Sequence, residues 1–407
     1  MVKKGRVFVN MHYMELGGAE RALLGLLNAL DTSRVEVDLF INQHTGEFMP
    51  LIPEKIHLLP EKRGYNAIER PMKQILLEGQ LGVLYGRLKA KRLHASYHAS
   101  LTGDAERMDS SGFQYVADAV QPFLPSLEYL GEYDLAVSFI TPHNIVLNKV
   151  KAKKKIAWIH TDYSTIHVNV EKELPVWGGY DHIMSISPDC TRSFLKTFPS
   201  LKDKIIEIEN ILSPDFVRAQ AELLDVTDEM PPSGIRLLSV GRYTHAKNYD
   251  NVPDIARRIV EAGCPDLRWY IIGFGSDEAL IRQKIADAGM QDHVILLGKK
   301  ENPYPYIKAC DIYVQPSRYE GKSVTVREAQ VLCRPVVVTD YPTAKSQISD
   351  GIDGVIVPMD NEACASGLIN VIKDKELQNT VSNYLATHDY GNESEVEKIY
   401  DLLDMNK

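Results

Sequence analysis

The sequence predicts a two-domain α/β protein in which each domain is built on a parallel sheet. Short apolar and β-branched runs alternate with segments of helix length along the whole chain. Strands that are apolar throughout indicate a sheet buried on both faces, which is typical of parallel sheets covered by helices. The length of 407 residues exceeds what one hydrophobic core usually supports. Two doubly wound, Rossmann-like domains follow from these observations.

Strands are expected at twelve places, six in each half of the chain. The first set is 6–10, 35–41, 134–139, 155–160, 182–187 and 204–210. The second set is 235–240, 267–273, 294–298, 311–317, 335–339 and 354–358. The acidic segment 221–234, rich in Pro, Ser and Gly, is the expected join because a fresh first strand follows it. The predicted domains are 1–215 and 216–390, and 391–407 reads as a final amphipathic helix that packs back on the first domain.

Composition and charge exclude several classes of protein. The chain is 44% hydrophobic and 25% charged, as in ordinary globular proteins. No apolar run approaches the roughly 20 residues that cross a bilayer, and the N-terminus enters a strand directly, so a cytoplasmic protein is expected. A net charge of -9 argues against a nucleic-acid partner. The cysteines show no CxxC spacing, which predicts reduced, mostly buried thiols and neither a zinc site nor disulfides. They are Cys190, Cys264, Cys310, Cys333 and Cys364.

Glycines stand at two expected strand-to-helix turns, where open α/β sheets bind ligands. Gly17 and Gly18 follow the first strand of the chain. They either form a tight turn or let the free amides of a helix N-terminus meet an anion. Gly273 and Gly275 lie in a similar turn of the second domain, where the backbone could pass close to a ligand.

Two cations follow the first strand of the second domain. Arg242 and Lys247 could hold a diphosphate without a metal, since arginine binds two oxygens and lysine acts as a point charge. Each charge-assisted hydrogen bond of this kind is worth roughly 1.5–3 kcal/mol. The alternative is that both side chains are ordinary solvated loop residues.

Glu320 and Glu328 stand in the exit loop of a strand and in the helix that follows. Either carboxylate could simply complement the helix dipole. The two carboxylates could also be the catalytic pair of a glycosidase, in which the carboxyl groups lie about 5–9.5 Å apart. Eight residues of helix rise about 12 Å, so this second interpretation requires the loop to fold back. In the third interpretation Glu320 binds sugar hydroxyls and Glu328 binds ribose hydroxyls. The backbone amides of 321–324 at the helix start would then hold a phosphate between them.

These motifs occur together in the order found in glycosyltransferase family 4, which the chain resembles. They are GGAER, SVGR with a lysine five residues on, IIGFG, and E-x7-E within EGKSVTVREA. The resemblance covers nearly all of the second half and the first few dozen residues. It implies the GT-B fold, with two domains facing across a cleft, and a retaining enzyme that transfers sugar from a nucleoside diphosphate sugar. It also implies that Glu320 contacts the donor sugar, Glu328 the ribose, and Arg242 with Lys247 the pyrophosphate.

The resemblance and the strand ends together define the predicted site. The donor-binding set is Gly17, Gly18, Arg242, Lys247, Gly273, Gly275, Glu320, Gly321, Lys322, Ser323, Val324 and Glu328. The catalytic set is His160, Glu320, Arg242 and Lys247. His160 matches the family's histidine at a strand tip of the first domain, with Asp162 as its orienting partner, or is a strand-end histidine bonded to backbone. His12 and His143 are weaker candidates.

No metal and no cofactor besides the donor substrate is expected, because the family works without a metal and the chain has no DxD motif. The expected reaction moves a hexose or N-acetylhexosamine to a hydroxyl of a glycan or lipid-linked glycan in cell-surface polysaccharide synthesis. UDP is favoured as the nucleotide and GDP is second. The alternatives are a GT-B nucleotide-sugar 2-epimerase and a non-catalytic nucleotide-sugar-binding protein.

The acceptor is expected on the first domain. Residues 66–95 combine an apolar helix face with basic residues, and the lysine-rich run 149–155 adds more charge. The basic residues considered in the first stretch are Lys73, Arg87, Lys89, Lys91 and Arg92. Such a stretch either lies on anionic lipid, at the inner face of the membrane, or packs on its own domain.

Two positions depart from the family pattern. Cys333 stands where the family usually has glycine, and Gln347 is nearest to an expected acid. Both departures bear on sugar specificity more than on the class of enzyme.

Overall fold

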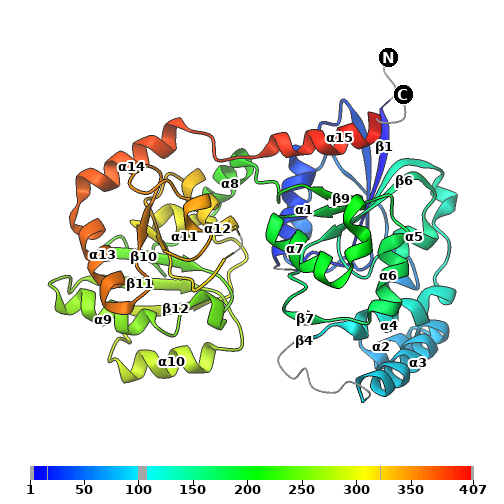
Figure 1. Cartoon of the computed structure of the whole chain (residues 1–407), viewed down its shortest axis with the longest axis horizontal. Helices are drawn as coiled ribbons and strands as arrows, with labels where there is room; N and C mark the ends of the chain where they lie inside the picture. The colour runs from blue at the N-terminus through cyan, green and yellow to red at the C-terminus, as the bar shows by residue number, and fades with distance from the viewer. Residues whose placement is uncertain (1–3, 16, 100–107, 321, 405–407) are drawn as a thin grey trace. The chain divides into compact units, whose positions relative to one another are not determined.

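The computed structural model describes residues 4–15, 17–99, 108–320 and 322–404. The chain forms two compact units (Figure 1). The first comprises Met1–Ile211 and Glu393–Lys407, and the second comprises Leu212–Asn392. Each unit is built on one parallel sheet, and no helix among the described residues has the length and apolar character needed to cross a membrane.

The sheet of the first unit has the strand order β3-β2-β1-β5-β6-β8-β9, with every neighbouring pair parallel. Chain order therefore reverses between β1 and β5. The strands are β1 (Gly5–Met11), β2 (Val35–Ile41), β3 (His57–Leu58), β5 (Tyr133–Ser138), β6 (Ala152–Ile159), β8 (His182–Ser185) and β9 (Ile205–Glu207). A separate two-stranded ladder pairs β4 (Met108–Asp109) with β7 (Ile166–His167).

The helices of the first unit bury an aromatic core against this sheet. Phe8, Tyr133, Trp177 and Phe194 belong to it and are almost fully buried. The helices are α1 (Gly18–Ala29), α2 (Met72–Leu77), α3 (Leu81–His98), α4 (Ser111–Val120), α5 (Asn144–Lys149), α6 (Val170–Gly178), α7 (Pro188–Thr197) and α15 (Glu397–Asp404). α3 packs on α2 and α4 (Figure 1).

The second unit has the strand order β12-β11-β10-β13-β14-β15, all parallel. Its strands are β10 (Ile235–Val240), β11 (Leu267–Ile272), β12 (Val294–Gly298), β13 (Ile312–Gln315), β14 (Val336–Thr339) and β15 (Val355–Val357). Its helices are α8 (Pro214–Ala221), α9 (Val252–Glu261), α10 (Glu278–Asp287), α11 (Tyr304–Ala309), α12 (Val324–Val331), α13 (Asn361–Lys373) and α14 (Lys375–Thr387). This is the doubly wound order of dinucleotide-binding domains, and it reverses between β10 and β13.

The second sheet is buried on both faces. Successive strand residues point to opposite sides of the sheet, so each strand contributes to a core cluster on either face. Leu237 of β10 lies in one core cluster and its neighbour Leu238 lies in the other. Helices α9 and α13 pack together, as do α8, α11 and α12. The continuous apolar runs that predicted parallel strands are explained by this double burial.

All twelve expected strands are present. The structure adds β3, β4 and β7, each of two residues, which are too short to give a recognisable apolar pattern. The boundary between the units lies before α8, N-terminal to the acidic segment 221–234. Val226 and Met230 of that segment are buried with Val217 in a core cluster of the second unit, so the segment is part of that unit and not a linker.

The end of the chain packs on the first unit through a short 3-10 turn (Glu393–Val396) and α15. The hydroxyl of Tyr400 accepts a hydrogen bond from the backbone amide of Asp31 at 2.7 Å. Arg34 pairs with Glu397 at 2.8 Å, and its guanidinium lies 3.6 Å from the centre of the Tyr400 ring. The apolar stripe predicted for the final helix is buried as well, at Val396, Ile399, Tyr400 and Leu402.

All five cysteines are free, and three of them are buried. Cys333 has φ of 55° in the turn that ends α12. The amide of Cys333 donates to the carbonyl of Gln330, and that of Arg334 donates to Ala329. This is the Schellman arrangement, in which the left-handed position is usually glycine.

We expect Cys333→Gly to raise the free energy of unfolding by about 1 kcal/mol, because a side chain in the left-handed region costs roughly 1–2 kcal/mol. Urea unfolding measures the change. Cys333→Ala keeps the Cβ atom and should change stability far less, so equal effects of the two substitutions would contradict a backbone origin.

Candidate functional site

The exits of β10 and β13 lie next to each other at the point where the strand order of the second sheet reverses. Lys247 ends the short 3-10 turn His245–Lys247 that follows β10, and Glu320 lies in the loop that follows β13. The Lys247 ammonium is 2.5 Å from Glu320 Oε1. The two side chains are only 20% and 12% exposed. Reversal points of open α/β sheets are the usual ligand sites of such domains.

A buried polar network holds the Glu320 carboxylate. Its Oε1 atom accepts hydrogen bonds from Gln315 Nε2 at 2.9 Å and from the Ser317 hydroxyl at 2.6 Å, besides the bond from Lys247. Its Oε2 atom makes no hydrogen bond with any residue that the structure describes. One carboxylate oxygen is therefore fixed by the protein, and the other is available to a ligand.

Gly241, the glycine of SVGR, lets the lysine side chain reach this position. A Cβ atom at residue 241 would lie 2.9 Å from the Tyr249 hydroxyl and 3.1 Å from Cε of Lys247. Any larger residue would push the lysine stem away. The motif is thus explained by packing inside the site.

Arg318 ties the two strand exits together. Its guanidinium binds both carboxylate oxygens of Asp250 at 2.8 Å and donates to the carbonyl of His245 at 2.6 Å. Because Asp250 and His245 belong to the loop that carries Lys247, this bidentate pair fixes the distance between the lysine and Glu320. Gln315, Ser317 and Arg318 were not among the site residues predicted from the sequence. The only local signal was a group of polar residues at the end of an otherwise apolar strand.

Gly273 and Gly275 allow the β11 exit loop to lie against the β10 exit loop. A Cβ atom at Gly273 would lie 1.9 Å from the carbonyl oxygen of Gly241, and one at Gly275 would lie 2.3 Å from that of Tyr243. Backbone hydrogen bonds join the loops, with Tyr243 N donating to Phe274 O and Asp277 N donating to Tyr243 O. This packing by itself requires glycine at both places, and donor contact by these residues stays a prediction.

Glu328 lies on α12 and is completely buried. The hydroxyl of Tyr304 donates to its Oε1 atom at 2.9 Å. At the start of α12 the amide of Ser323 donates to Gln347 Oε1 at 3.0 Å, and Gln347 Nε2 donates to the Ser323 carbonyl at 2.6 Å. One of the amides expected to hold a phosphate is therefore bonded to Gln347. Gly321 lies outside the described residues.

Lys322, Val324 and Arg242 are the remaining members of this predicted set in the second unit. Lys322 is exposed, and Val324 begins α12 and is partly buried. Arg242 is exposed and forms no hydrogen bond or ion pair with any residue that the structure describes. The structure therefore brings Lys247 and Glu320 together and leaves the Arg242 side chain unengaged.

His160 follows β6 of the first unit and packs beside Phe139, with ring centres 4.5 Å apart. Its Nε2 atom is buried and has no hydrogen-bond partner among the described residues. Burial lowers the pKa of His160 to about 3, which keeps the imidazole neutral. The Asp162 carboxylate accepts from the Ser164 amide at 2.9 Å and forms no described bond with His160, so the expected orienting contact is absent from the described residues.

Two further histidines belong to the same edge of the first sheet. His143 lies in the loop after β5, and its Nδ1 atom is 2.8 Å from the Ser138 hydroxyl. Burial lowers the pKa of His143, and a positive charge on His12 would lower it further. His12 at the end of β1 pairs through Nδ1 with Glu69 at 3.0 Å. His12 and His143 therefore follow the two strands between which the order reverses, and His160 follows the neighbouring strand β6.

The start of α1 is occupied by one of the protein's own carboxylates. Gly17 caps the helix and Gly18 is its first residue. A Cβ atom at Gly17 would lie 2.0 Å from Oε2 of Glu20, a buried acid whose pKa is raised by burial. Gly17 thus makes room for Glu20, and nothing lies within 4 Å of a Cβ atom at Gly18.

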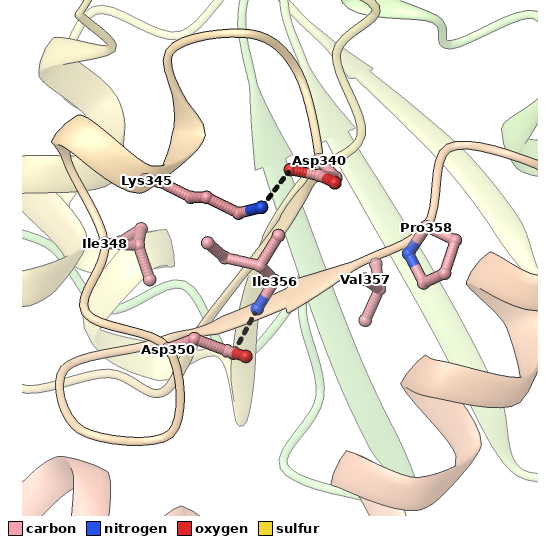
Figure 2. A pocket seen from close by; sticks show the side chains of 7 residues that line it. All are labelled: Asp340, Lys345, Ile348, Asp350, Ile356, Val357 and Pro358. Carbon is pink, nitrogen blue, oxygen red and sulfur yellow. Dashed lines mark hydrogen bonds and ion pairs between the residues drawn. The ribbon is translucent and has the colours of Figure 1, made fainter.

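A cavity of about 330 Å³ lies at the exits of β14 and β15 (Figure 2). Asp340 and Lys345 face each other across it at 3.9 Å, and the Asp350 carboxylate accepts from the amide of Ile356 at 2.8 Å. None of the predicted site residues lines this cavity. It is therefore separate from the Lys247–Glu320 site.

Residues 228–387 match the family described as Glycosyl transferases group 1. The match covers most of the second unit, which is therefore similar to this family, glycosyltransferase family 4.

Three curated relatives are glycosyltransferases. The N-acetylgalactosamine-N,N'-diacetylbacillosaminyl-diphospho-undecaprenol 4-alpha-N-acetylgalactosaminyltransferase of Campylobacter jejuni is 29% identical over 37% of this chain and 41% of the relative. The amylovoran biosynthesis glycosyltransferase AmsD of Erwinia amylovora is 25% identical over 41% of this chain and 48% of the relative. The poly(ribitol-phosphate) alpha-N-acetylglucosaminyltransferase of Staphylococcus aureus is 24% identical over 57% of this chain and 46% of the relative. The aligned regions thus span less than half of each of these relatives.

Solved structures show the same fold over the whole chain. HepE of Anabaena, in complex with UDP and glucose, has a TM-score of 0.66 at 13% identity and covers 98% of this chain and 99% of its own. TarM of S. aureus, in a complex containing UDP, has a TM-score of 0.63 at 12% identity. The match covers 98% of this chain and 100% of the TarM chain. The two parallel-sheet units therefore constitute a GT-B fold, as the sequence predicted.

We expect the protein to lose stability as pH falls below 6.5, in part through His160. The unfolded chain binds a proton there near pH 6.5, whereas the folded chain does so only near pH 3. Between these values folding must exclude the proton, which costs about 2 kcal/mol at pH 5. His160→Gln removes this cost, so the difference in unfolding free energy between pH 7 and pH 5 should be smaller in the variant.

The control is His388→Gln, which removes an exposed histidine of the second unit. Denaturant unfolding at the two pH values measures both variants. Equal pH dependence of the wild type and His160→Gln would show that His160 is not held neutral.

Proposed function

We propose that the protein is a metal-independent retaining glycosyltransferase that uses a nucleoside diphosphate sugar. The sugar is a hexose or N-acetylhexosamine, and the acceptor is a hydroxyl of a glycan or lipid-linked glycan in surface polysaccharide synthesis. The observation that carries the proposal is the Lys247–Glu320 pair at the reversal point of a sheet in a group 1 glycosyl transferase unit. The three curated relatives are named as glycosyltransferases, which supports sugar transfer.

The site suits a reaction whose leaving group is a diphosphate. As the glycosidic bond breaks, negative charge grows on the phosphate oxygens, and fixed positive groups stabilise it. The Lys247 ammonium keeps two N–H donors after one bonds to Glu320. Arg242 is exposed and unengaged, so it is available as the second cation. Glu320 would accept a sugar hydroxyl through its unused Oε2 atom.

No carboxylate nucleophile is needed in this scheme. Glu320 is already bonded to Lys247, and Glu328 is buried beneath Tyr304, so neither acts as one half of a glycosidase pair. The departing phosphate oxygen would take the proton of the acceptor hydroxyl while the new glycosidic bond forms on the same face of the sugar. A neutral His160 would serve as a hydrogen-bonding group rather than as a cation.

UDP is the nucleotide we favour, with GDP second. Two of the solved structures with this fold contain UDP, which supports the choice. A panel of UDP, GDP and ADP in thermal unfolding separates them, since a nucleotide at 100 times its Kd stabilises by about 2.7 kcal/mol.

We expect Glu320→Gln to lower kcat roughly 100- to 1,000-fold while the Kd for the nucleoside diphosphate changes little. The amide keeps an oxygen for Lys247 but loses the charge that binds the sugar. Release of nucleoside diphosphate from the donor, with and without acceptor, measures turnover. Glu320→Ala is less informative, because it also removes the partner that holds Lys247.

The matched control is Glu301→Gln, which changes an exposed acid of the same unit and should leave both constants unaltered. EDTA should not slow donor turnover. A wild-type protein that binds nucleotide without releasing diphosphate would be a binding protein, and one that converts the donor to its epimer without acceptor would be an epimerase. Either result contradicts the proposed reaction.

The acceptor surface that we propose is the outer face of α2 and α3. Leu77, Leu81 and Tyr85 are 78%, 62% and 61% exposed there. Basic residues flank them, and those that are exposed are Lys73, Lys89, Lys91 and Arg92. An exposed apolar stripe beside cations suits the anionic surface that carries a lipid-linked acceptor.

Not every predicted cation contributes to this surface. Arg87 points inward and donates to the carbonyls of Ala67 and Arg70. The run 149–155 extends into β6, and its lysines bond to the protein. Lys149 Nζ donates to the Leu124 carbonyl and Lys153 pairs with Asp134. The lysine-rich run is therefore largely structural.

We expect salt-sensitive binding to vesicles that contain phosphatidylglycerol. Lys89→Ala combined with Lys91→Ala should weaken it about 30-fold, since each lysine near an anionic surface is worth roughly 1 kcal/mol. Co-sedimentation at low and high salt measures the effect. Lys284→Ala with Lys308→Ala, two exposed lysines of the second unit, is the control. An equal loss in both double variants would rule out this face as the contact surface.

A further inference from the structure

Two histidines and an aspartate converge at the end of α3. His94 and His98 are four residues apart and therefore lie on one face of the helix. His94 Nε2 is 2.9 Å and His98 Nδ1 is 2.8 Å from the same atom, Oδ2 of Asp109 in β4. These three atoms all lie within 4.8 Å of one another. The cluster plays no part in the donor site of the second unit.

Asp109 is oriented by groups behind it. Its Oδ1 atom accepts from the amide of Ser111 at 3.0 Å and from the Ser111 hydroxyl at 2.6 Å. That leaves Oδ2 directed at the two imidazoles. Asp109 also belongs to the β4–β7 ladder, in which it pairs with His167, so its backbone is fixed as well.

The side chain of His94 is also held in place by its neighbours. The Tyr115 ring lies 5.6 Å from the His94 ring between centres. A Cβ atom at Gly112 would lie only 3.3 Å from Cε1 of His94, so glycine there leaves room for the imidazole. Partners of this kind, which hold ligand side chains in place, are typical of metal sites.

We propose that His94, His98 and Asp109 bind a divalent transition-metal ion, with Zn²⁺ the favoured occupant. Two imidazole nitrogens and one carboxylate oxygen are ligands that zinc accepts, at about 2.0–2.2 Å. Tetrahedral bonds of that length place ligand atoms roughly 3.3 Å apart. The present separations of 2.8 and 2.9 Å need only a small outward rotation of the rings.

Three protein ligands leave one coordination position for water. The site opens to solvent on the side of His98, whose side chain is 64% exposed, whereas those of His94 and Asp109 are 30% and 18% exposed. Access of the ion is therefore direct. Bound metal ties the end of α3 to β4 and so fixes the helix that carries the proposed acceptor surface. The inference goes beyond the proposed function and does not depend on it.

The test uses untagged protein treated with EDTA and then dialysed. Titration calorimetry with ZnCl₂ should show one equivalent bound per chain, and Co²⁺ should give the intense visible absorption of a tetrahedral site. His94→Gln and His98→Gln should each weaken Zn²⁺ binding by at least about 100-fold. Ser111→Ala keeps all three ligands and should weaken it about tenfold.

His57→Gln is the matched control, because His57 is an exposed histidine that pairs with a single carboxylate, Asp38. It should leave the titration unchanged, and circular dichroism checks that every variant is folded. Absence of a Zn²⁺ equivalent in the wild type overturns the proposal, as does a titration that His94→Gln and His98→Gln leave unaltered. Donor turnover is insensitive to EDTA in the proposed reaction, so failure of the metal site and failure of the proposed function are distinguishable.

Discussion

The ion pair between Lys247 and Glu320 is the interaction on which the candidate site depends. It joins the exits of the two strands between which the order of the second sheet reverses, and it is largely shielded from water. Shielding an ion pair from water costs desolvation free energy, so this pair contributes more to the placement of Lys247 and Glu320 than to stability. Gln315 and Ser317 repay part of that cost by bonding the same carboxylate oxygen. The result is a preorganised cation beside an oxygen that remains available to a ligand.

Glycines in the family motifs are explained by close approach within the protein. Gly241 makes room for the stem of Lys247, and Gly17 makes room for the carboxylate of Glu20. Gly273 and Gly275 let two strand exits touch through their backbones. In each case a Cβ atom would fall within about 3 Å of another atom, closer than van der Waals contact permits. The motifs therefore build the frame of the site, whatever further contact they make with a ligand.

The predicted site residues of the two units are held by different kinds of contact. In the second unit the carboxylates are bonded to cations or hydroxyls, as Glu320 is to Lys247 and Glu328 is to Tyr304. In the first unit, the buried His143 and the partly buried His160 each keep a buried nitrogen without a partner among the described residues. A buried polar atom that lacks a hydrogen bond is costly, and such atoms often mark functional positions. Burial lowers the pKa of both imidazoles, which keeps them neutral.

The sequence by itself determined the strands, the double burial of each sheet and the spacing of the motifs, because these follow from local patterns of apolar residues. It also indicated that Lys247 and Glu320 stand after strands. Only the tertiary structure decided which residues meet: Lys247 bonds to a partner 73 positions away, and Arg318 to one 68 positions away. It likewise showed that the lysine-rich run 149–155 bonds to the protein and that His94 and His98 face Asp109. Contacts between distant segments depend on strand order and loop packing, which no short window of sequence records.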